Sequence, residues 1–171
     1  MREQYWAMYS KIQYQSYYYK HFQTLFNRIN WCISVFCSIT TLSSIAAWGI
    51  WKTYPLIWSL LICASQLIQA IFPTLPYNDL LTSTHFMICA IDKLLLDINH
   101  DWLKIELFEY SDEKILELLE KYENSYSDLT SQFFSGKYLP DIKYCERKAE
   151  TECATYFYLK YNVGKEILNH D

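Results

Sequence analysis

A histidine and a cysteine four positions apart are the residues best spaced for metal chemistry in this sequence. His85 and Cys89 would lie on one face of a helix, with Asp92 one turn further along. Zinc in proteins generally takes four ligands, or three ligands and a water molecule, and the sequence offers no second cluster of such residues. Ordinary packing is therefore the better interpretation, and we expect neither a metal nor any other cofactor.

Catalytic motifs with a fixed spacing are absent from the sequence. Its three glycines are isolated, so no GxSxG turn, phosphate-binding loop or GxGxxG motif occurs. The pair His100 and Asp101 is typical of a solvated helix face. We expect a protein that is not an enzyme and that has no catalytic residue.

Charged residues are distributed unevenly along the 171-residue chain. The sequence has 15 Lys and Arg and 19 Asp and Glu, yet Lys52 is the only charged residue between Trp31 and Phe72. The net charge of −4, without a run of basic residues, argues against nucleic acid as a partner. Six cysteines occur without CxxC spacing, which indicates reduced packing residues and not a disulfide framework.

Polar side chains inside this uncharged range follow two helical stripes. Steps of three and four residues place them on one face of each of two helices, and lipid would not favour such faces. The first stripe consists of Ser34, Ser38, Thr41 and Ser44, and the second of Ser59, Cys63, Gln66 and Gln69. They either pack helices together through small residues and amides, or line an aqueous pore. One hairpin cannot enclose a pore, so both interpretations imply a homo-oligomer.

The helices that carry these stripes have the length of membrane spans. Residues 31–50 form an uncharged stretch of twenty, about 30 Å long as a helix, and residues 56–72 a second of seventeen. Pro55 is well placed to begin the second helix, and Pro73 follows its end. The membrane-boundary anchors would be Trp31, Trp48, Trp51, Lys52, Tyr54 and Trp58. The alternative is a pair of buried helices in a soluble bundle, but the two lengths and the aromatic edges favour a transmembrane hairpin.

The flanking segments predict further helices. Residues 1–30 form an amphipathic pattern without Pro or Gly, residues 31–77 hold the hairpin, and residues 78–171 form a helical region. Ser111, followed by two acidic residues, predicts a capped helix start. Basic residues before the first span place both termini in the cytoplasm. The predicted fold class is therefore an all-α membrane protein with an N-terminal amphipathic helix, a two-helix transmembrane hairpin and cytoplasmic C-terminal helices.

An aromatic and basic helix, "YYYKHFQTLFNRIN", leads directly into the hairpin and is followed by further helices. In this arrangement the chain resembles SLATT proteins, the two-transmembrane effector domains associated with SMODS nucleotidyltransferases or SLOG sensors in bacterial conflict systems. The likeness covers residues 5–161 and rests on architecture, because the family has no catalytic motif.

The resemblance implies a membrane effector of antiphage defence in the bacterial inner membrane. Such a protein would oligomerise when triggered and form a pore or disrupt the lipid bilayer. Its trigger would be a separately encoded sensor or a nucleotide-signal-producing enzyme. The competing hypothesis is a non-enzymatic, membrane-anchored adaptor whose cytoplasmic helices bind a partner protein.

Overall fold

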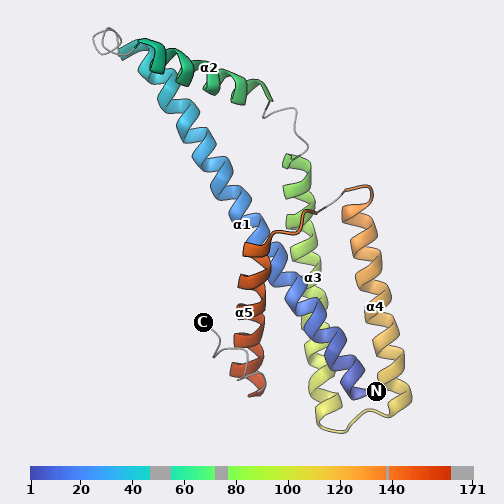
Figure 1. The fold of residues 1–171 in the computed structure, drawn as a ribbon. Coiled ribbons are helices and arrows are strands. Elements are labelled where there is room, and N and C mark those ends of the chain that lie inside the picture. Colours follow the sequence, from blue (N-terminus) through green and yellow to red (C-terminus); the bar gives the residue numbers. More distant parts are fainter. Residues whose placement is uncertain (47–54, 72–76, 138, 163–171) are drawn as a thin grey trace. The chain divides into compact units, whose positions relative to one another are not determined.

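A computed structural model describes residues 1–46, 55–71, 77–137 and 139–162 of the chain (Figure 1). These residues form five α-helices that account for nearly all of the described chain. The helices are α1 (Arg2–Ala46), α2 (Pro55–Ile71), α3 (Tyr77–Glu106), α4 (Asp112–Phe134) and α5 (Lys143–Tyr161). The part of the prediction that concerns helical secondary structure is confirmed.

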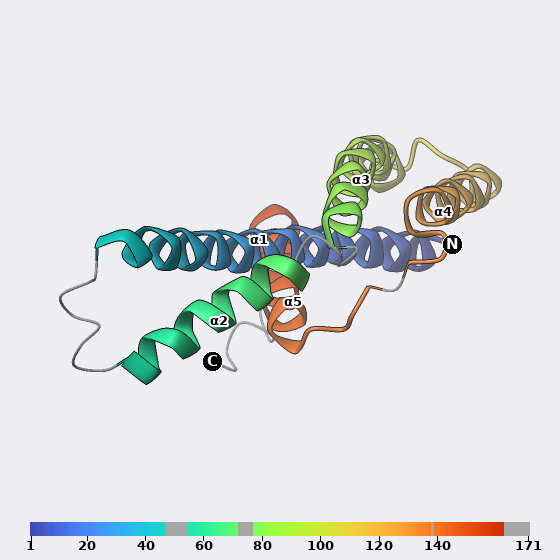
Figure 2. The same ribbon diagram turned by 90° about the horizontal axis from the view of Figure 1, so that it is seen from above.

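The helices belong to two compact units. The bundle unit comprises residues 1–23 and 80–171, and the hairpin unit comprises residues 24–79. Helix α1 supplies residues to both units, because it runs without a break through the position at which we expected the amphipathic helix to give way to the first span. Within the bundle unit, α3 and α4 run antiparallel and pack with α5 and the first part of α1 (Figures 1 and 2).

The core of the bundle unit is made by the apolar stripes that the sequence predicts. Each helix turns its three- and four-residue repeat inward, which removes large apolar side chains from water. The buried members include Tyr5, Tyr9, Ile12 and Phe22 of α1, Met87, Ile91, Ile98 and Ile105 of α3, Ile115, Leu118 and Tyr122 of α4, and Cys145, Ala149 and Phe157 of α5. The amphipathic pattern predicted for residues 1–30 is thereby confirmed for the first part of α1.

Tyrosine hydroxyls connect the helices of this core. Tyr5 of α1 donates to the carbonyl oxygen of Ile98 in α3 at 3.0 Å, and Tyr122 of α4 donates to the Asp101 carboxylate at 2.6 Å. The Tyr18 hydroxyl donates to the carbonyl oxygen of Pro140 at 2.7 Å. A buried phenol needs such an acceptor because an unpaired polar group inside a core is costly.

Two helix ends between α3 and α4 show how the sequence sets the boundaries. The Ser111 side chain accepts a hydrogen bond from the Lys114 backbone N–H at 3.4 Å, so the predicted cap is confirmed. Helix α3 ends in a Schellman motif: the Glu109 N–H donates to the Lys104 carbonyl at 3.0 Å. The left-handed position of this motif is occupied by Phe108, with φ of 62°, where glycine is the usual residue.

The predicted transmembrane hairpin is wrong. Within the described ranges, no helix combines the length and the apolar character that a bilayer crossing requires. Helix α2 has 17 residues and is about 25 Å long, short of a hydrocarbon core of about 30 Å. The uncharged part of α1 is continuous with a polar helix and carries several hydroxyl side chains.

Three further predictions depended on the transmembrane hairpin and are corrected together with it. The single charge over residues 31–72, that of Lys52, indicated an apolar environment, but charge alone does not measure helix length or mean hydropathy. The fold class of all-α membrane protein, the multi-pass location in the inner membrane and the pore-forming character are therefore contradicted by the same finding.

We expect Ser111→Ala to lower the free energy of unfolding by about 1 kcal/mol, because the Lys114 N–H loses its side-chain acceptor. Urea denaturation measures the change. The matched control is Ser125→Ala in the same helix, where the hydroxyl bonds to the Lys121 carbonyl and alanine is the better helix former. An equal loss in both variants would contradict the capping role.

Two substitutions at residue 108 separate backbone strain from side-chain contacts. Phe108→Ala and Phe108→Gly both remove the ring, which is 75% exposed and lies 3.8 Å below the Arg2 guanidinium carbon. Only glycine occupies the left-handed region without a Cβ penalty, so we expect Phe108→Gly to be more stable than Phe108→Ala by about 1 kcal/mol. Thermal and urea unfolding of the pair measure this difference, and equal stabilities would show that position 108 is unstrained.

Candidate functional site

The serines predicted to line a pore or to pack α1 lie on an exposed surface. Ser34 and Ser38 are exposed. The Ser38 hydroxyl donates to the carbonyl oxygen of Ser34 at 2.8 Å. A serine that bonds to the carbonyl one turn earlier needs neither pore water nor a neighbouring helix as partner. The side chains of Thr41 and Ser44 fall outside the described part of the structure.

The predicted polar residues of α2 are exposed as well. Ser59 donates to the carbonyl oxygen of Leu56 at 2.9 Å, again within its own helix. Gln66 and Gln69 face outward, and among the described residues no hydrogen bond joins either amide to α1. Within the described ranges, the two polar stripes therefore share no hydrogen-bond network.

Most of the predicted membrane-boundary anchors cannot be placed. Trp48, Trp51, Lys52 and Tyr54 lie outside the described residues, and so does the side chain of Trp58. Trp31 is described and is 67% exposed on α1.

An apolar stripe on the outer face of α2 is the feature that sequence reasoning missed. Its steps of four, three, four and four residues keep it on one face of the helix, opposite the buried Ser65. The outer stripe consists of Leu56, Leu60, Cys63, Leu67 and Ile71, all of them exposed. Leu56 is 71% exposed, and Leu60 and Leu67 are each 62% exposed. The spacing was available in the sequence, but the sequence does not show which side of an uncharged helix is covered.

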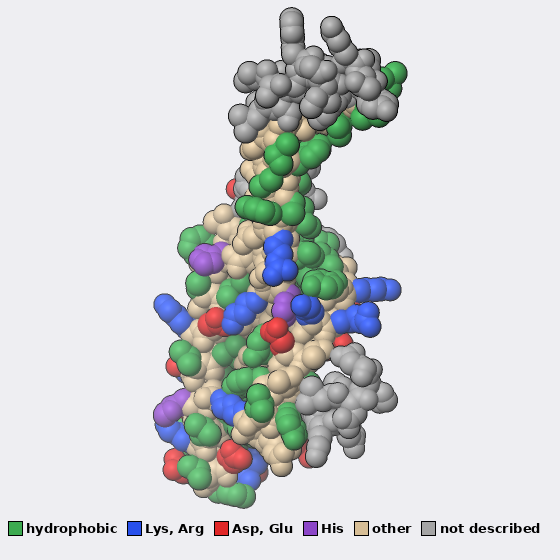
Figure 3. Space-filling model, turned by 90° about the vertical axis from the view of Figure 1, so that its left-hand side faces the viewer, with side chains coloured by type: hydrophobic (Ala, Val, Ile, Leu, Met, Phe, Trp, Pro, Cys, Tyr) green, Lys and Arg blue, Asp and Glu red, His purple; other side chains and the backbone are tan. Residues whose placement is uncertain are grey.

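The surface of the hairpin unit carries few charges beside this stripe. In Figure 3, the described residues in the upper part of the view are drawn mainly in the colours of apolar and uncharged polar side chains. Helix α2 itself contains no acidic or basic residue. Exposed apolar surface of this kind usually marks a site of interaction.

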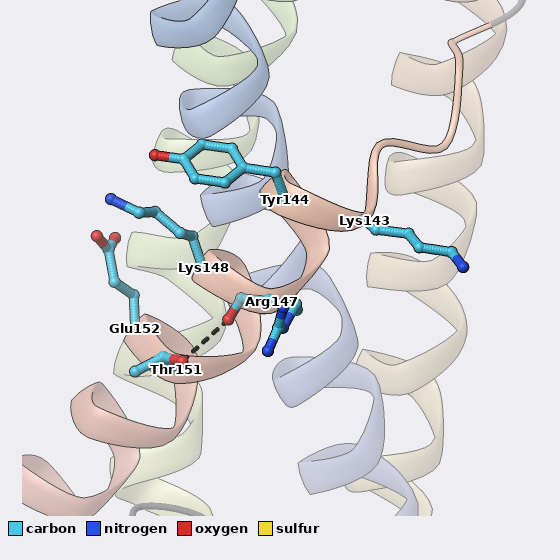
Figure 4. A pocket seen from close by; sticks show the side chains of 6 residues that line it. All are labelled: Lys143, Tyr144, Arg147, Lys148, Thr151 and Glu152. Carbon is cyan, nitrogen blue, oxygen red and sulfur yellow. Dashed lines mark hydrogen bonds between the residues drawn. The ribbon is translucent and has the colours of Figure 1, made fainter. Parts of the chain in front are cut away.

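A hollow of about 570 Å³ lies along α5 and has a basic lining. Its lining residues are Lys143, Tyr144, Arg147, Lys148, Thr151 and Glu152. Tyr144, Lys148 and Glu152 project to one side of the helix, whereas Lys143 projects to the other (Figure 4). Because the three cations point in different directions, they do not converge on one anion, and the hollow has no geometry for a specific ligand.

A second set of polar side chains lies in the bundle unit, and its members share hydrogen-bond partners. We call Tyr9, Asn99, Tyr156, Lys160 and Tyr161 the tyrosine–lysine cluster, which joins α1, α3 and α5. The Tyr9 and Tyr156 hydroxyl oxygens are 2.9 Å apart, and Tyr161 donates to the Asn99 side-chain oxygen at 3.0 Å. The Lys160 ammonium donates to the Tyr156 hydroxyl at 2.7 Å and also to Asn99.

Burial keeps two phenols of the cluster, those of Tyr9 and Tyr161, protonated. Burial raises the pKa of Tyr9 far above its ordinary value, and its hydrogen bond with Tyr156 raises that pKa further. Burial also raises the pKa of Tyr161, although the hydrogen bond with Tyr9 and the neighbouring Lys160 act in the opposite direction. The Lys160 ammonium lies 5.1 Å from the Tyr156 ring centre and 5.3 Å from that of Tyr161, within the range of a cation–π contact.

His85 and Cys89 do not form part of a metal centre among the described residues. The Cys89 Sγ atom lies 4.0 Å from the His85 Nε2 atom. Asp92 accepts hydrogen bonds from Ser16 at 3.0 Å and from Lys20 at 2.8 Å, so its carboxylate is already engaged. Across the part of the chain that the structure covers, no group of three or more His, Cys, Asp or Glu could hold a metal ion.

The six cysteines are free, as the sequence predicts, but only some of them are packing residues. Cys145 and Cys153 are buried in α5, whereas Cys32, Cys63 and Cys89 are exposed. The interpretation of all six as packing residues is therefore wrong for the exposed three.

No protein-family model, curated protein or solved structure matches this chain.

Burial raises the pKa of the Cys153 thiol to about 11, so very little thiolate is present at pH 8. We expect iodoacetamide at pH 8 to modify Cys32 and Cys89 well before Cys153, and the Cys153 rate to rise steeply as the pH approaches 11. Peptide mass spectrometry measures each rate. In denaturant the three rates should converge, and a fast native reaction at Cys153 would contradict the burial of this thiol.

Proposed function

We propose that this chain is a non-enzymatic helical protein that acts by binding another protein chain, and that the outer stripe of α2 is the binding surface. We infer that the partner on this surface is a second copy of the same chain. The observation that carries the proposal is the exposure of Leu56, Leu60 and Leu67 along one face of a helix without charges. A helix face of large apolar side chains is normally covered by another element or chain.

The chemistry of the outer stripe favours a protein partner that is itself apolar and uncharged. A charged partner surface would lose its hydration against this face without gaining an opposite charge. A second copy of α2 meets the requirement because it presents the same uncharged stripe. A two-fold interface uses one patch twice, so no separate complementary surface is needed.

The spacing of the stripe fits helix-to-helix packing. Leu56, Leu60, Cys63 and Leu67 follow steps of four, three and four residues, which is the pattern of the seam in helix pairs that pack with side chains interlocked. The small Cys63 side chain in the middle allows close approach of the two helices.

Two carboxylates of the bundle unit, those of Asp101 and Asp92, are engaged in structural contacts. Asp101 accepts hydrogen bonds from Tyr122 at 2.6 Å and from Tyr110 at 3.2 Å. Asp92 is held by Ser16 and Lys20. These contacts support a binding function over a reaction. The resemblance to SLATT proteins and a triggered role in antiphage defence stay predictions.

Light scattering coupled to size-exclusion chromatography tests the association. We expect the full chain to elute as a dimer or a larger oligomer of the 20.5 kDa subunit, down to concentrations of about 1 μM. Leu60→Glu places a charge at the centre of the outer stripe and should weaken association by at least about tenfold, because the carboxylate would be buried against apolar side chains.

The matched control is Gln69→Glu, which adds the same charge to an exposed position of α2 outside the outer stripe. It should leave the oligomer intact, and circular dichroism should show both variants to be helical. Modification of Cys63 gives an independent readout: it should be slower than that of Cys89 in the native chain and should accelerate in Leu60→Glu. A native chain that is monomeric at about 50 μM would refute the proposal.

A further inference from the structure

The tyrosine–lysine cluster is rich in hydrogen-bond donors. The Asn99 side-chain oxygen has two lone pairs, and Lys160 and Tyr161 donate to it. Tyr9 donates to the same oxygen at 3.4 Å and lies 2.9 Å from the Tyr156 hydroxyl, where either hydroxyl can be the donor. We assign the shorter bond to a Tyr9 proton directed to Tyr156. Tyr156 then accepts from Tyr9 and from Lys160.

This assignment leaves two protons without an acceptor inside the cluster. One is the hydroxyl proton of Tyr156, and the other is the third ammonium proton of Lys160. Both residues line a groove of about 310 Å³ between α1, α3 and α5. The two unused donors therefore belong to side chains that border the same space.

The remaining walls of the groove indicate what kind of molecule would fit. Leu95 and Leu96 supply an apolar surface, and Gln13, which is only 7% exposed, supplies an amide. Asp92 lies at the border of the groove, with its charge paired to Lys20 at 2.8 Å. A volume of this size accepts a small molecule and excludes a large one.

We propose that this groove binds a small organic monocarboxylate, whose two oxygens accept from Lys160 and Tyr156 and whose apolar body lies on Leu95 and Leu96. A carboxylate has two acceptor oxygens and no donor, which matches a pair of unused donors. Charge-assisted hydrogen bonds to an ammonium group are stronger than neutral ones. The site is independent of the outer stripe, because every residue that forms it belongs to the bundle unit.

The charges around the groove limit the ligand to one negative charge. Among its lining residues Lys160 is the cation, and Asp92 is the acid. A ligand with two or more negative charges would place the additional charge near Asp92, where like charges repel. A phosphate monoester should therefore bind less tightly than a carboxylate of similar size.

Isothermal titration of the full chain with benzoate tests the site. Benzoate combines a carboxylate with a flat apolar body, and we expect saturable binding with a Kd of about 1 mM. Benzamide, which lacks the charge, and phenyl phosphate, which carries more of it, should each bind at least about tenfold more weakly. Amide NMR spectra should show benzoate-dependent shifts around Asn99 and Lys160.

Two variants and a matched control assign the contacts. Lys160→Met removes the charge and should weaken benzoate binding about tenfold, and Tyr156→Phe removes the hydroxyl and should weaken it severalfold. Lys148→Met removes an exposed lysine from the same helix, outside the groove, and should leave the affinity unchanged. Leu60→Glu should also bind benzoate normally, so failure of the outer-stripe proposal would not affect this result.

Three results would overturn the inference. They are the absence of saturable benzoate binding up to about 20 mM, equal binding of benzoate and benzamide, and an equal effect of Lys148→Met and Lys160→Met. Tighter binding of phenyl phosphate than of benzoate would likewise exclude a carboxylate as the preferred ligand.

Discussion

The need of each buried phenol for a hydrogen-bond partner organises the bundle unit. Tyrosine brings a large apolar ring into the core, but its hydroxyl must find an acceptor there. Tyr5 finds the Ile98 carbonyl, Tyr18 the Pro140 carbonyl and Tyr122 the Asp101 carboxylate, each on a different segment of the chain. Because these acceptors have fixed positions, the hydroxyls specify the register of the helices more sharply than apolar contact alone.

The sequence supports reliable conclusions about the bundle unit and misleading ones about the hairpin unit. Apolar repeats at helical spacing place Ile91 and Ile115 in the core, and a serine before two acids places the start of α4. Such signals are local, so a single sequence contains them. Helix α2 has no charged residue, and this absence of charge suggested a membrane span. The helix has 17 residues, and no helix among the described residues is both long and apolar enough to cross a membrane.

Long-range contacts explain why the tyrosine–lysine cluster escaped prediction. Tyr9 and Tyr156 meet across nearly the whole chain, and Asn99 reaches them from a third helix. No spacing rule relates residues so distant, because their approach depends on how three helices pack. The high tyrosine content, 16 residues, was visible in the sequence, but composition does not show which hydroxyls would meet. The outer stripe differs from this cluster, because its four- and three-residue steps are visible in the sequence. Only the exposure of its side chains required the structure.

The buried tyrosines also give the fold an alkaline limit. Burial holds the pKa values of Tyr5, Tyr9, Tyr19 and Tyr122 above 10, the ordinary value of the unfolded chain. Their contribution to stability is complete below pH 10 and falls as the pH rises above it, because the unfolded chain releases protons that the folded chain retains. Each such phenol favours unfolding by about tenfold per pH unit in that range. The raised pKa values of these phenols therefore leave stability unchanged in mild acid and lower it in base.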